Sequence, residues 1–262
     1  MIAMLVAGRL SDLIGRKKIL IVVAFLYSFS AITSAFSFSY ETLYLSRMIG
    51  GIAFGTALIL APTYIAEISN AENRGRLVSI QQLNIVLGFF AAFLSNYFFN
   101  EYNSSGSEFL NDNNVWRWML GVEFIPAILY FFALYFVPKS PRWLYVRGFI
   151  NESKSVLKKL HGKSKYLIEL DSIKQSVISN VKSKKVPLKT LLNPSLRFIM
   201  IVGLTLGILQ QITGINAIYF YATSIFKQTG IGTDAAFSSG VLLSFTTVVF
   251  TLLAIFLIDR MG

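Results

Sequence analysis

The sequence predicts an all-α integral membrane protein, built as a bundle of membrane-spanning helices. Its composition is the first observation behind this prediction. Hydrophobic residues make up 54% of the 262 residues and charged residues only 14%, and the mean hydropathy is +0.60. A soluble domain needs more polar surface than this composition supplies. The other two observations are the lengths of the apolar segments and the alternating charge of the loops between them.

Six apolar segments are long enough to cross a bilayer, which takes about 20 residues as a helix. They cover residues 19–38, 43–66, 77–99, 116–137, 196–226 and 236–258. Residues 1–8 are apolar but too short to cross, so we expect them to end a span that starts before residue 1. A signal peptide is disfavoured there, because a charged start and a cleavage site are both missing.

Basic residues gather in alternate loops. Four Lys and Arg lie in 9–18, two in 74–76 and fourteen in 139–197. The intervening loops contain mainly acidic residues, with Lys227 as the exception; these are Glu41, Glu101, Glu108, Asp112 and Asp234. The positive-inside rule predicts that the basic loops, including 139–195, are cytoplasmic. We therefore expect a multi-pass protein of the cell membrane.

The long basic loop differs in character from the spans. In "NESKSVLKKLHG", Val156, Leu157 and Leu160 recur at helical spacing beneath a basic face. The pattern favours short amphipathic helices on the cytoplasmic side over a solvated basic linker, which remains the alternative. We expect three units: an amino-terminal membrane part (1–138), a cytoplasmic helical linker (139–195) and a second membrane part (196–262).

The motif "GRLSDLIGRKK" joins the first apolar segment to the next. Gly8 and Asp12 are one helical turn apart and share a face, and Gly15 permits a tight turn before Arg16. The chain ends in "DRMG", with Asp259 and Arg260, which matches the spacing of Asp12 to Gly15. This echo predicts two homologous halves, a common design in transporters.

A charged residue also lies within a glycine-rich apolar segment. Arg47 lies inside an apolar segment. A charged side chain within a membrane span costs free energy, is usually paired, and marks a candidate functional site. Gly50, Gly51 and Gly55 predict close helix packing.

Glu67 ends the same span, and we expect a cytoplasmic charge cluster with Asp12, Arg16, Arg74 and Arg76. Such a cluster can close one conformation and break in another. The alternative is a set of solvated surface pairs that contribute little.

The stretch "QQITGINAIYFY" holds more hydrogen-bonding groups than a membrane helix needs. Gln211 and Asn216 are about 140° apart on a regular helix, so they do not share a face. A break at Gly214 would let them converge with Gln210 on one cavity. Amides both donate and accept hydrogen bonds, which suits a ligand covered in hydroxyl groups. The alternative is that these amides only join neighbouring helices.

These motifs together resemble the sugar porters of the major facilitator superfamily. The resemblance rests on "GRLSDLIGRKK", "RMIGGIAFGTALILAPTYIAEISNAENRGRL", "VPKSPRWL" and "QQITGINAIYFY", in the family's order and spacing. It implies part of a twelve-helix bundle, from the end of helix 2 to helix 8. It also implies transport of a hexose or pentose by alternating access. In proton-coupled members of the family, an Asp on the first helix pairs with the Arg that matches Arg47. The resemblance begins only at the end of helix 2, so uniport and proton symport both stay open.

The resemblance also implies roles for individual residues. It assigns sugar binding to Gln210, Gln211 and Asn216, with Gln82 as the contact from the amino-terminal half. Apart from the resemblance, Tyr64, Tyr219 and Tyr221 are candidates to line or gate a sugar path, because the apolar faces of sugars stack on aromatic rings. A conformational charge network is implied for Asp12, Arg16, Arg47, Glu67, Arg74, Arg142, Asp259 and Arg260. Two departures stand out. Lys139 replaces a usual acidic residue, which weakens a contact expected near Arg142, and Thr247 replaces a sugar-binding Asn.

Other classes are weaker. The chain has no Cys and a single His, His161, so we predict no catalytic residue, metal site or cofactor. The net charge of +11 lies in the loops, which indicates a membrane rather than a nucleic-acid partner. We therefore expect a monosaccharide, the lipid bilayer and an optional proton as partners. A sugar sensor of the same fold and an inactive truncated fragment remain the alternatives.

Overall fold

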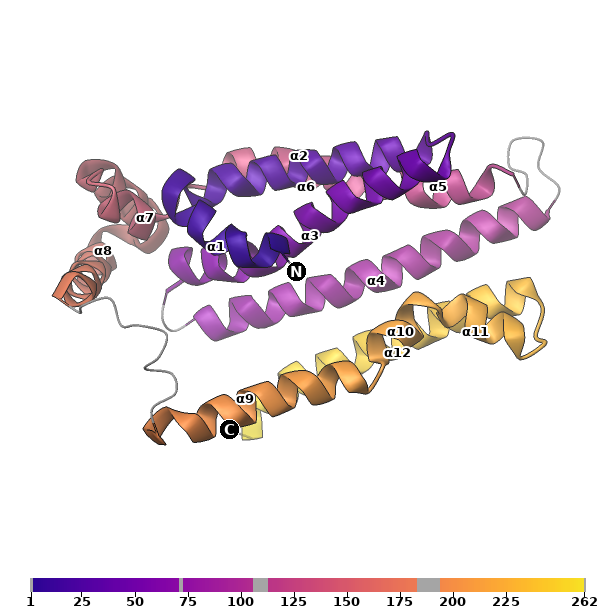
Figure 1. Cartoon of the computed structure of the whole chain (residues 1–262). Coiled ribbons are helices and arrows are strands. Elements are labelled where there is room, and N and C mark those ends of the chain that lie inside the picture. Colours follow the sequence, from indigo (N-terminus) through magenta and orange to yellow (C-terminus); the bar gives the residue numbers. More distant parts are fainter. Residues whose placement is uncertain (1, 71–72, 106–112, 183–193, 262) are drawn as a thin grey trace.

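The protein is a helical bundle, described here by a computed structural model that covers residues 2–70, 73–105, 113–182 and 194–261. Every regular element within these residues is a helix (Figure 1). The helices of the first part are α1 (Ile2–Ile14), α2 (Arg16–Ala35), α3 (Tyr40–Ile68), α4 (Arg74–Ser104), α5 (Val115–Gly121) and α6 (Phe124–Phe136). The remaining helices are α7 (Pro141–Val146), α8 (Ile150–Lys182), α9 (Pro194–Ile212), α10 (Ile215–Phe220), α11 (Ala222–Gln228) and α12 (Thr233–Met261).

The six predicted spans are confirmed as helices long and apolar enough to cross a membrane. They are Arg16–Ala35, Tyr40–Ile68, Arg74–Ser104, Val115–Phe136, Leu196–Phe220 and Thr233–Leu257. They run back and forth between two ends of the bundle (Figure 1). We call the end with the α1–α2 turn, α7 and α8 the basic end, and the end with the α2–α3 and α11–α12 turns the opposite end.

The first loop is shorter than predicted. Residues 9–14 continue α1, and only Gly15 interrupts the helix before α2 begins. Nothing in 2–14 breaks a helix, and the Ser11 hydroxyl donates to the Gly8 carbonyl at 2.7 Å. Gly15 has φ 101°, and the place of a Cβ there lies 3.1 Å from the Trp143 ring. The predicted tight turn at Gly15 is therefore confirmed, and this backbone conformation favours glycine.

The core lies where α2 packs against α3 and α6. Leu20 and Leu60 are each 1% exposed. The Ser30 hydroxyl donates to the Ser46 carbonyl at 2.7 Å, which joins α2 to α3 by a buried polar contact. The predicted close packing is confirmed at Gly50, where an added Cβ would lie 2.5 Å from the Ser30 hydroxyl oxygen.

The other two glycines of that motif differ from Gly50. A Cβ at Gly55 would make an ordinary contact of 3.5 Å with Met4, whereas one at Gly51 would meet nothing within 4 Å. The prediction of close packing at Gly51 is therefore wrong, because this residue is on the outer side of the helix.

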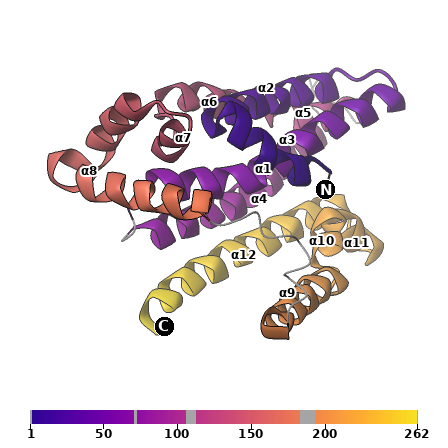
Figure 2. The same ribbon diagram turned by 60° about the vertical axis from the view of Figure 1, so that its left-hand side comes forward.

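One seam joins the first part, α1–α6, to the second, α9–α12. It runs between α4 and α12 (Figure 2). At the opposite end, Asn100 Nδ2 donates to Asp234 Oδ1 at 2.6 Å and the Ser104 hydroxyl donates to the same oxygen at 3.2 Å. Further along, a Cβ on Gly240 would lie 2.8 Å from the Phe93 ring, so the two backbones approach closely there.

Short helices follow the first part, as predicted for the basic loop. Ser140 caps α7 by accepting from the Trp143 backbone N–H at 3.2 Å. Gly162 (φ 75°, ψ 175°) interrupts α8 and divides it into two helical segments. Part of the predicted linker, 183–193, lies outside the described residues, and the division into three units stays a prediction.

Candidate functional site

The helix break at Gly214 is confirmed. α9 ends at Ile212, Gly214 takes a left-handed conformation with φ 70°, and α10 begins at Ile215. Across this break, Asn216 Nδ2 donates to Gln211 Oε1 at 3.3 Å. The two amides therefore meet, as the sequence predicted, although they would lie on different faces of an unbroken helix.

Two other predicted residues lie apart from this amide pair. Gln210 is exposed, and its backbone carbonyl accepts from the Thr213 hydroxyl at 2.7 Å. Tyr221 is 64% exposed and lies at a second break, between α10 and α11. No hydrogen bond within the described residues joins either side chain to Gln211 or Asn216, so their sugar-binding roles stay predictions.

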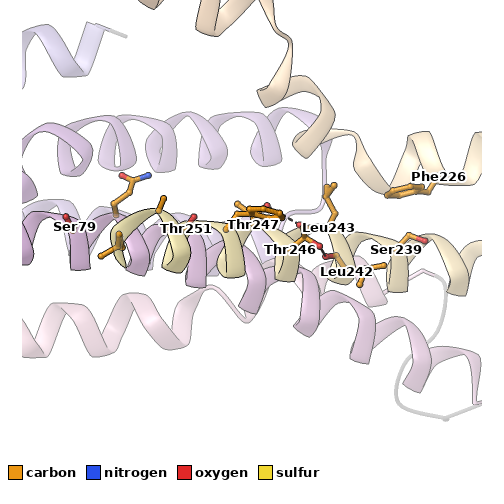
Figure 3. A pocket seen from close by; sticks show the side chains of 12 residues that line it. Ser79, Phe226, Ser239, Leu242, Leu243, Thr246, Thr247 and Thr251 are labelled. Carbon is orange, nitrogen blue, oxygen red and sulfur yellow. Dashed lines mark hydrogen bonds between the residues drawn. The ribbon is translucent and has the colours of Figure 1, made fainter. Parts of the chain in front are cut away.

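A cavity of about 820 Å³ runs along one face of α12 and contains the predicted residue Gln82. Its α12 residues recur at helical spacing, and Ser79 and Gln82 from α4 and Phe226 from α11 complete the wall (Figure 3). The α12 residues are Ser239, Leu242, Leu243, Thr246, Thr247, Phe250, Thr251, Ala254 and Ile255. Gln210, Gln211, Asn216 and Tyr221 are not among the lining residues.

Sequence reasoning named Thr247 as the replacement of a sugar-binding Asn, but it missed the other hydroxyl groups of this wall. Thr246, Thr247 and Thr251 are all on the lined face, and their helical spacing in "SFTTVVFTL" is the signal that would have found them. Thr247 shares a hydrogen bond with the hydroxyl of Tyr219 in α10. The Tyr219 ring in turn stacks on Phe89 of α4, with centroids 6.2 Å apart. Tyr219 thus connects the segment that holds Asn216 to the cavity wall.

Tyr64 has a different place. It is 5% exposed in the core of the first part, and its hydroxyl donates to the Pro138 carbonyl. Tyr64 is not among the residues that line the cavity, so its role along a sugar path stays a prediction.

A buried ion pair lies at the basic end. Arg16 Nε is 2.8 Å from Glu67 Oε2, and their side chains are 13% and 7% exposed. Asp12 approaches the same guanidinium at 3.1 Å. The Ser140 hydroxyl donates to Glu67 at 2.6 Å. Three members of the predicted charge cluster therefore meet, and Ser140 connects them to α7.

The other predicted members form no ion pair with this group among the described residues. Arg74 is exposed at the start of α4. Arg142 lies near enough for its charge to act on Glu67, but its guanidinium donates to the Ser176 hydroxyl at 3.2 Å. The side chains of Asp259 and Arg260 lie outside the described residues. Lys139, at the position where an acidic residue is usual, forms an exposed pair with Glu152 at 2.7 Å.

Arg47 has a partner that sequence reasoning missed. Its guanidinium is 3.1 Å from Glu123 Oε2, and the side chains are 48% and 33% exposed. Both residues lie within candidate membrane spans, so Arg47 is paired as predicted but only half-buried. The signal was a single carboxylate inside an apolar segment, "LGVEFIPAIL".

Comparison with known proteins decides the family. The family model described as "Sugar (and other) transporter" matches residues 1–262. The chain belongs to this sugar transporter family. The chain is 37% identical over 258 residues to the arabinose-proton symporter of Bacillus subtilis, covering 98% of the chain and 54% of that relative. It is 33% identical to the D-xylose transporter of Levilactobacillus brevis over 259 residues, 97% of the chain and 53% of that relative.

Solved structures give the same fold. The chain matches the partially occluded inward-open xylose transporter XylE from E. coli with a TM-score of 0.83 at 30% identity. This match covers 100% of the chain and 60% of the XylE chain. XylE bound to 6-bromo-6-deoxy-D-glucose also gives 0.83, at 32% identity, over 57% of that chain. The fold is thus that of the major facilitator superfamily, and the chain spans about half the length of its relatives. The family is one of transport proteins rather than enzymes.

Proposed function

We propose that this sugar transporter moves a monosaccharide across the cell membrane by alternating access of its two membrane parts. The observation that carries this proposal is the break at Gly214, which brings Gln211 and Asn216 together. Tyr219 of the same segment bonds to Thr247, which lines a cavity together with Gln82 and further hydroxyl groups. The volume of about 820 Å³ is within the range of small-molecule sites, roughly 300–1,000 Å³. The named substrates of two relatives, arabinose and D-xylose, support a pentose, and the 6-bromo-6-deoxy-D-glucose bound to XylE supports a hexose.

A counterflow assay tests this function. The protein, expressed from its own gene and reconstituted in liposomes preloaded with unlabelled sugar, should accumulate labelled arabinose, xylose or glucose. Gln82→Ala should weaken the apparent affinity about tenfold, since one amide contact to a hydroxyl is lost. Gln81→Ala is the matched control, because Gln81 is the preceding residue and does not line the cavity. Equal affinities in the two variants would contradict the proposal.

We further propose that proton coupling uses the Arg47–Glu123 pair. A carboxylate within a membrane span is costly unless it is paired or protonated, and Glu123 has a partner at 3.1 Å. Protonation of Glu123 would release Arg47, and the pair would re-form when the proton leaves. The name of the arabinose-proton symporter supports coupling in this family.

The test separates driven transport from exchange. Glu123→Gln should abolish uptake driven by an imposed pH gradient while counterflow persists, because exchange needs no net proton movement. Glu101→Gln, an exposed carboxylate at the end of α4, is the control and should leave both intact. Gradient-driven uptake by Glu123→Gln at the wild-type rate would show that coupling uses another group.

A further inference from the structure

Two lysines approach each other where α2 begins and α6 ends. Lys17 Nζ donates to the Tyr135 carbonyl, in the last turn of α6, at 3.0 Å. Lys139 follows the end of α6 by three residues, and it lies near enough for its charge to act on Lys17. Like charges at close range repel, so an anion that contacts both lysines is stabilised there.

These cations are only partly balanced by carboxylates. Lys139 pairs with Glu152 at 2.7 Å, but both side chains are about half exposed. Lys17 forms no ion pair among the described residues, where the carboxylates of the buried ion pair approach Arg16 instead. A lysine ammonium has three N–H donors. Each of the two lysines has spent one on the bonds above, so both retain donors for an anion.

Exposed apolar side chains extend from these lysines along α2 and α6. Lys18, next to Lys17, is exposed and continues at helical spacing the row on α2. The rows are Val22, Phe25, Phe29 and Ile32 on α2, and Ile125, Leu129, Phe132 and Phe136 on α6. The two helices pack against each other, and both belong to candidate membrane spans. The apolar surface of these spans therefore ends in a group of three lysines.

This order of groups is complementary to a phospholipid. Acyl chains suit the apolar rows, and a phosphate at the membrane boundary suits the lysines, whose long stems let the charge reach the headgroup level. Basic groups between the ends of membrane spans bind anionic headgroups. We propose that Lys17, Lys18 and Lys139 bind the headgroup of an anionic phospholipid whose acyl chains lie along α2 and α6. The site concerns lipid rather than sugar, so it goes beyond the proposed function.

Native mass spectrometry of lipid binding tests the site. The whole protein, expressed from its own gene and purified in detergent, is titrated with phosphatidylglycerol, which is anionic. A parallel titration uses phosphatidylcholine with the same acyl chains, which is zwitterionic. The wild type should bind phosphatidylglycerol about tenfold more tightly. This preference should shrink as the ammonium acetate concentration rises, because salt screens exposed charges.

Substitutions of Lys139 give the sharpest contrast. Lys139→Gln should weaken the binding of phosphatidylglycerol about fivefold and leave that of phosphatidylcholine unchanged. Lys139→Glu should weaken it further, because a carboxylate repels the phosphate. Lys17→Gln should match Lys139→Gln, whereas Lys17→Arg keeps the charge and should bind as the wild type does. Lys159→Gln is the matched control, because Lys159 is an exposed cation of α8 outside the candidate spans.

Three results would overturn the site. They are equal affinity of the wild type for the two lipids, unchanged binding of phosphatidylglycerol by both Lys139 variants, and full displacement of the lipid by glycerol 1-phosphate. The last result would show a site for a free phosphate compound, since glycerol 1-phosphate has no acyl chains. A loss in both Lys139 variants with none in Lys159→Gln supports the site. If Lys17→Gln fails to fold without its bond to Tyr135, the Lys139 variants decide, because they break an exposed pair.

Discussion

Helices α2 and α9, one from each membrane part, differ in how far the described residues enclose them, although both are apolar. In α1–α6, helix α2 is enclosed by its neighbours, and 44% of its most apolar 18-residue stretch is buried within the protein. In α9–α12, the corresponding stretch of the span Leu196–Phe220 has no buried residues. The first part is also tied by buried polar contacts, such as Ser30 with Ser46. The second part is joined to it mainly through the seam between α4 and α12.

This difference predicts where substitutions cost most. Helix association in lipid depends on close packing and on interhelical hydrogen bonds, because lipid tails are as apolar as the side chains they meet. Substitutions of enclosed side chains, as in α2, should therefore lower the free energy of unfolding more than substitutions of exposed ones, as in α9. The predictions below probe this contrast from the largest expected effect to the smallest.

The largest effect is expected for Glu67→Ala. This change leaves the Arg16 guanidinium, 13% exposed, with only Asp12 as a counter-charge. Removing one partner of a buried pair should cost about 3 kcal/mol of unfolding free energy. Denaturant titration in micelles, followed by tryptophan fluorescence, measures it.

The matched control is Glu152→Ala, which removes the partner of Lys139. That pair is about half exposed on both sides, so its loss should cost less than about 1 kcal/mol. Equal losses in the two variants would show that burial does not distinguish these ion pairs.

The next largest loss of unfolding free energy is expected when a substitution creates a void in the core of the first part. Leu20→Ala removes a side chain that is 1% exposed, and the void should cost about 2–3 kcal/mol. Leu206→Ala in α9 removes one that is 63% exposed, and it should change the unfolding free energy by less than about 0.5 kcal/mol. A comparable loss at Leu206 would mean that α9 packs against a protein surface.

Two adjacent glycines give a smaller and sharper contrast. Gly50→Ala places a Cβ 2.5 Å from the Ser30 hydroxyl oxygen and should destabilise by about 1–3 kcal/mol. Gly51→Ala meets open space, and it should stabilise by about 0.5–1 kcal/mol because alanine is the better helix former. Thermal unfolding of both variants measures the difference, and the reverse order would place the helix contact on the Gly51 face.

The sequence was sufficient for much of this arrangement. Apolar length predicted the six spans, and the amide spacing around Gly214 predicted a break that the structure contains. Both are local signals, since a glycine with positive φ or a long apolar run depends little on distant residues. They determined the helices and the amide pair of Gln211 and Asn216.

Contacts between distant residues were harder to predict. The pairing of Arg47 with Glu123 and of Tyr219 with Thr247 joins residues 76 and 28 positions apart. Their meeting depends on how the helices pack, which periodicity does not specify. Arg74 failed to join Glu67 for the same reason, because the start of α4 is exposed. Local pattern thus predicted which residues carry the chemistry better than it predicted their partners.

The smallest effect on unfolding is expected at the seam. Asp234→Ala removes the acceptor for Asn100 and Ser104, but Asp234 is exposed, so the cost should be about 1 kcal/mol or less. The spacing of the two parts should respond more strongly, because this contact joins α4 to α12 at the opposite end. The absence of native Cys allows spin labels at Tyr102→Cys and Ile231→Cys to report that distance.

Without the contact, the distance distribution between the two labels should broaden and move to larger values. Asp234→Asn keeps an oxygen acceptor and should retain most of the wild-type distribution, which separates the hydrogen bonds from the charge. Glu101→Ala, which removes an exposed carboxylate from the same end of α4, should leave the distribution unchanged. If Asp234→Ala gives the same distribution as Glu101→Ala, then the close approach of Gly240 to Phe93 is enough to hold this end of the seam together.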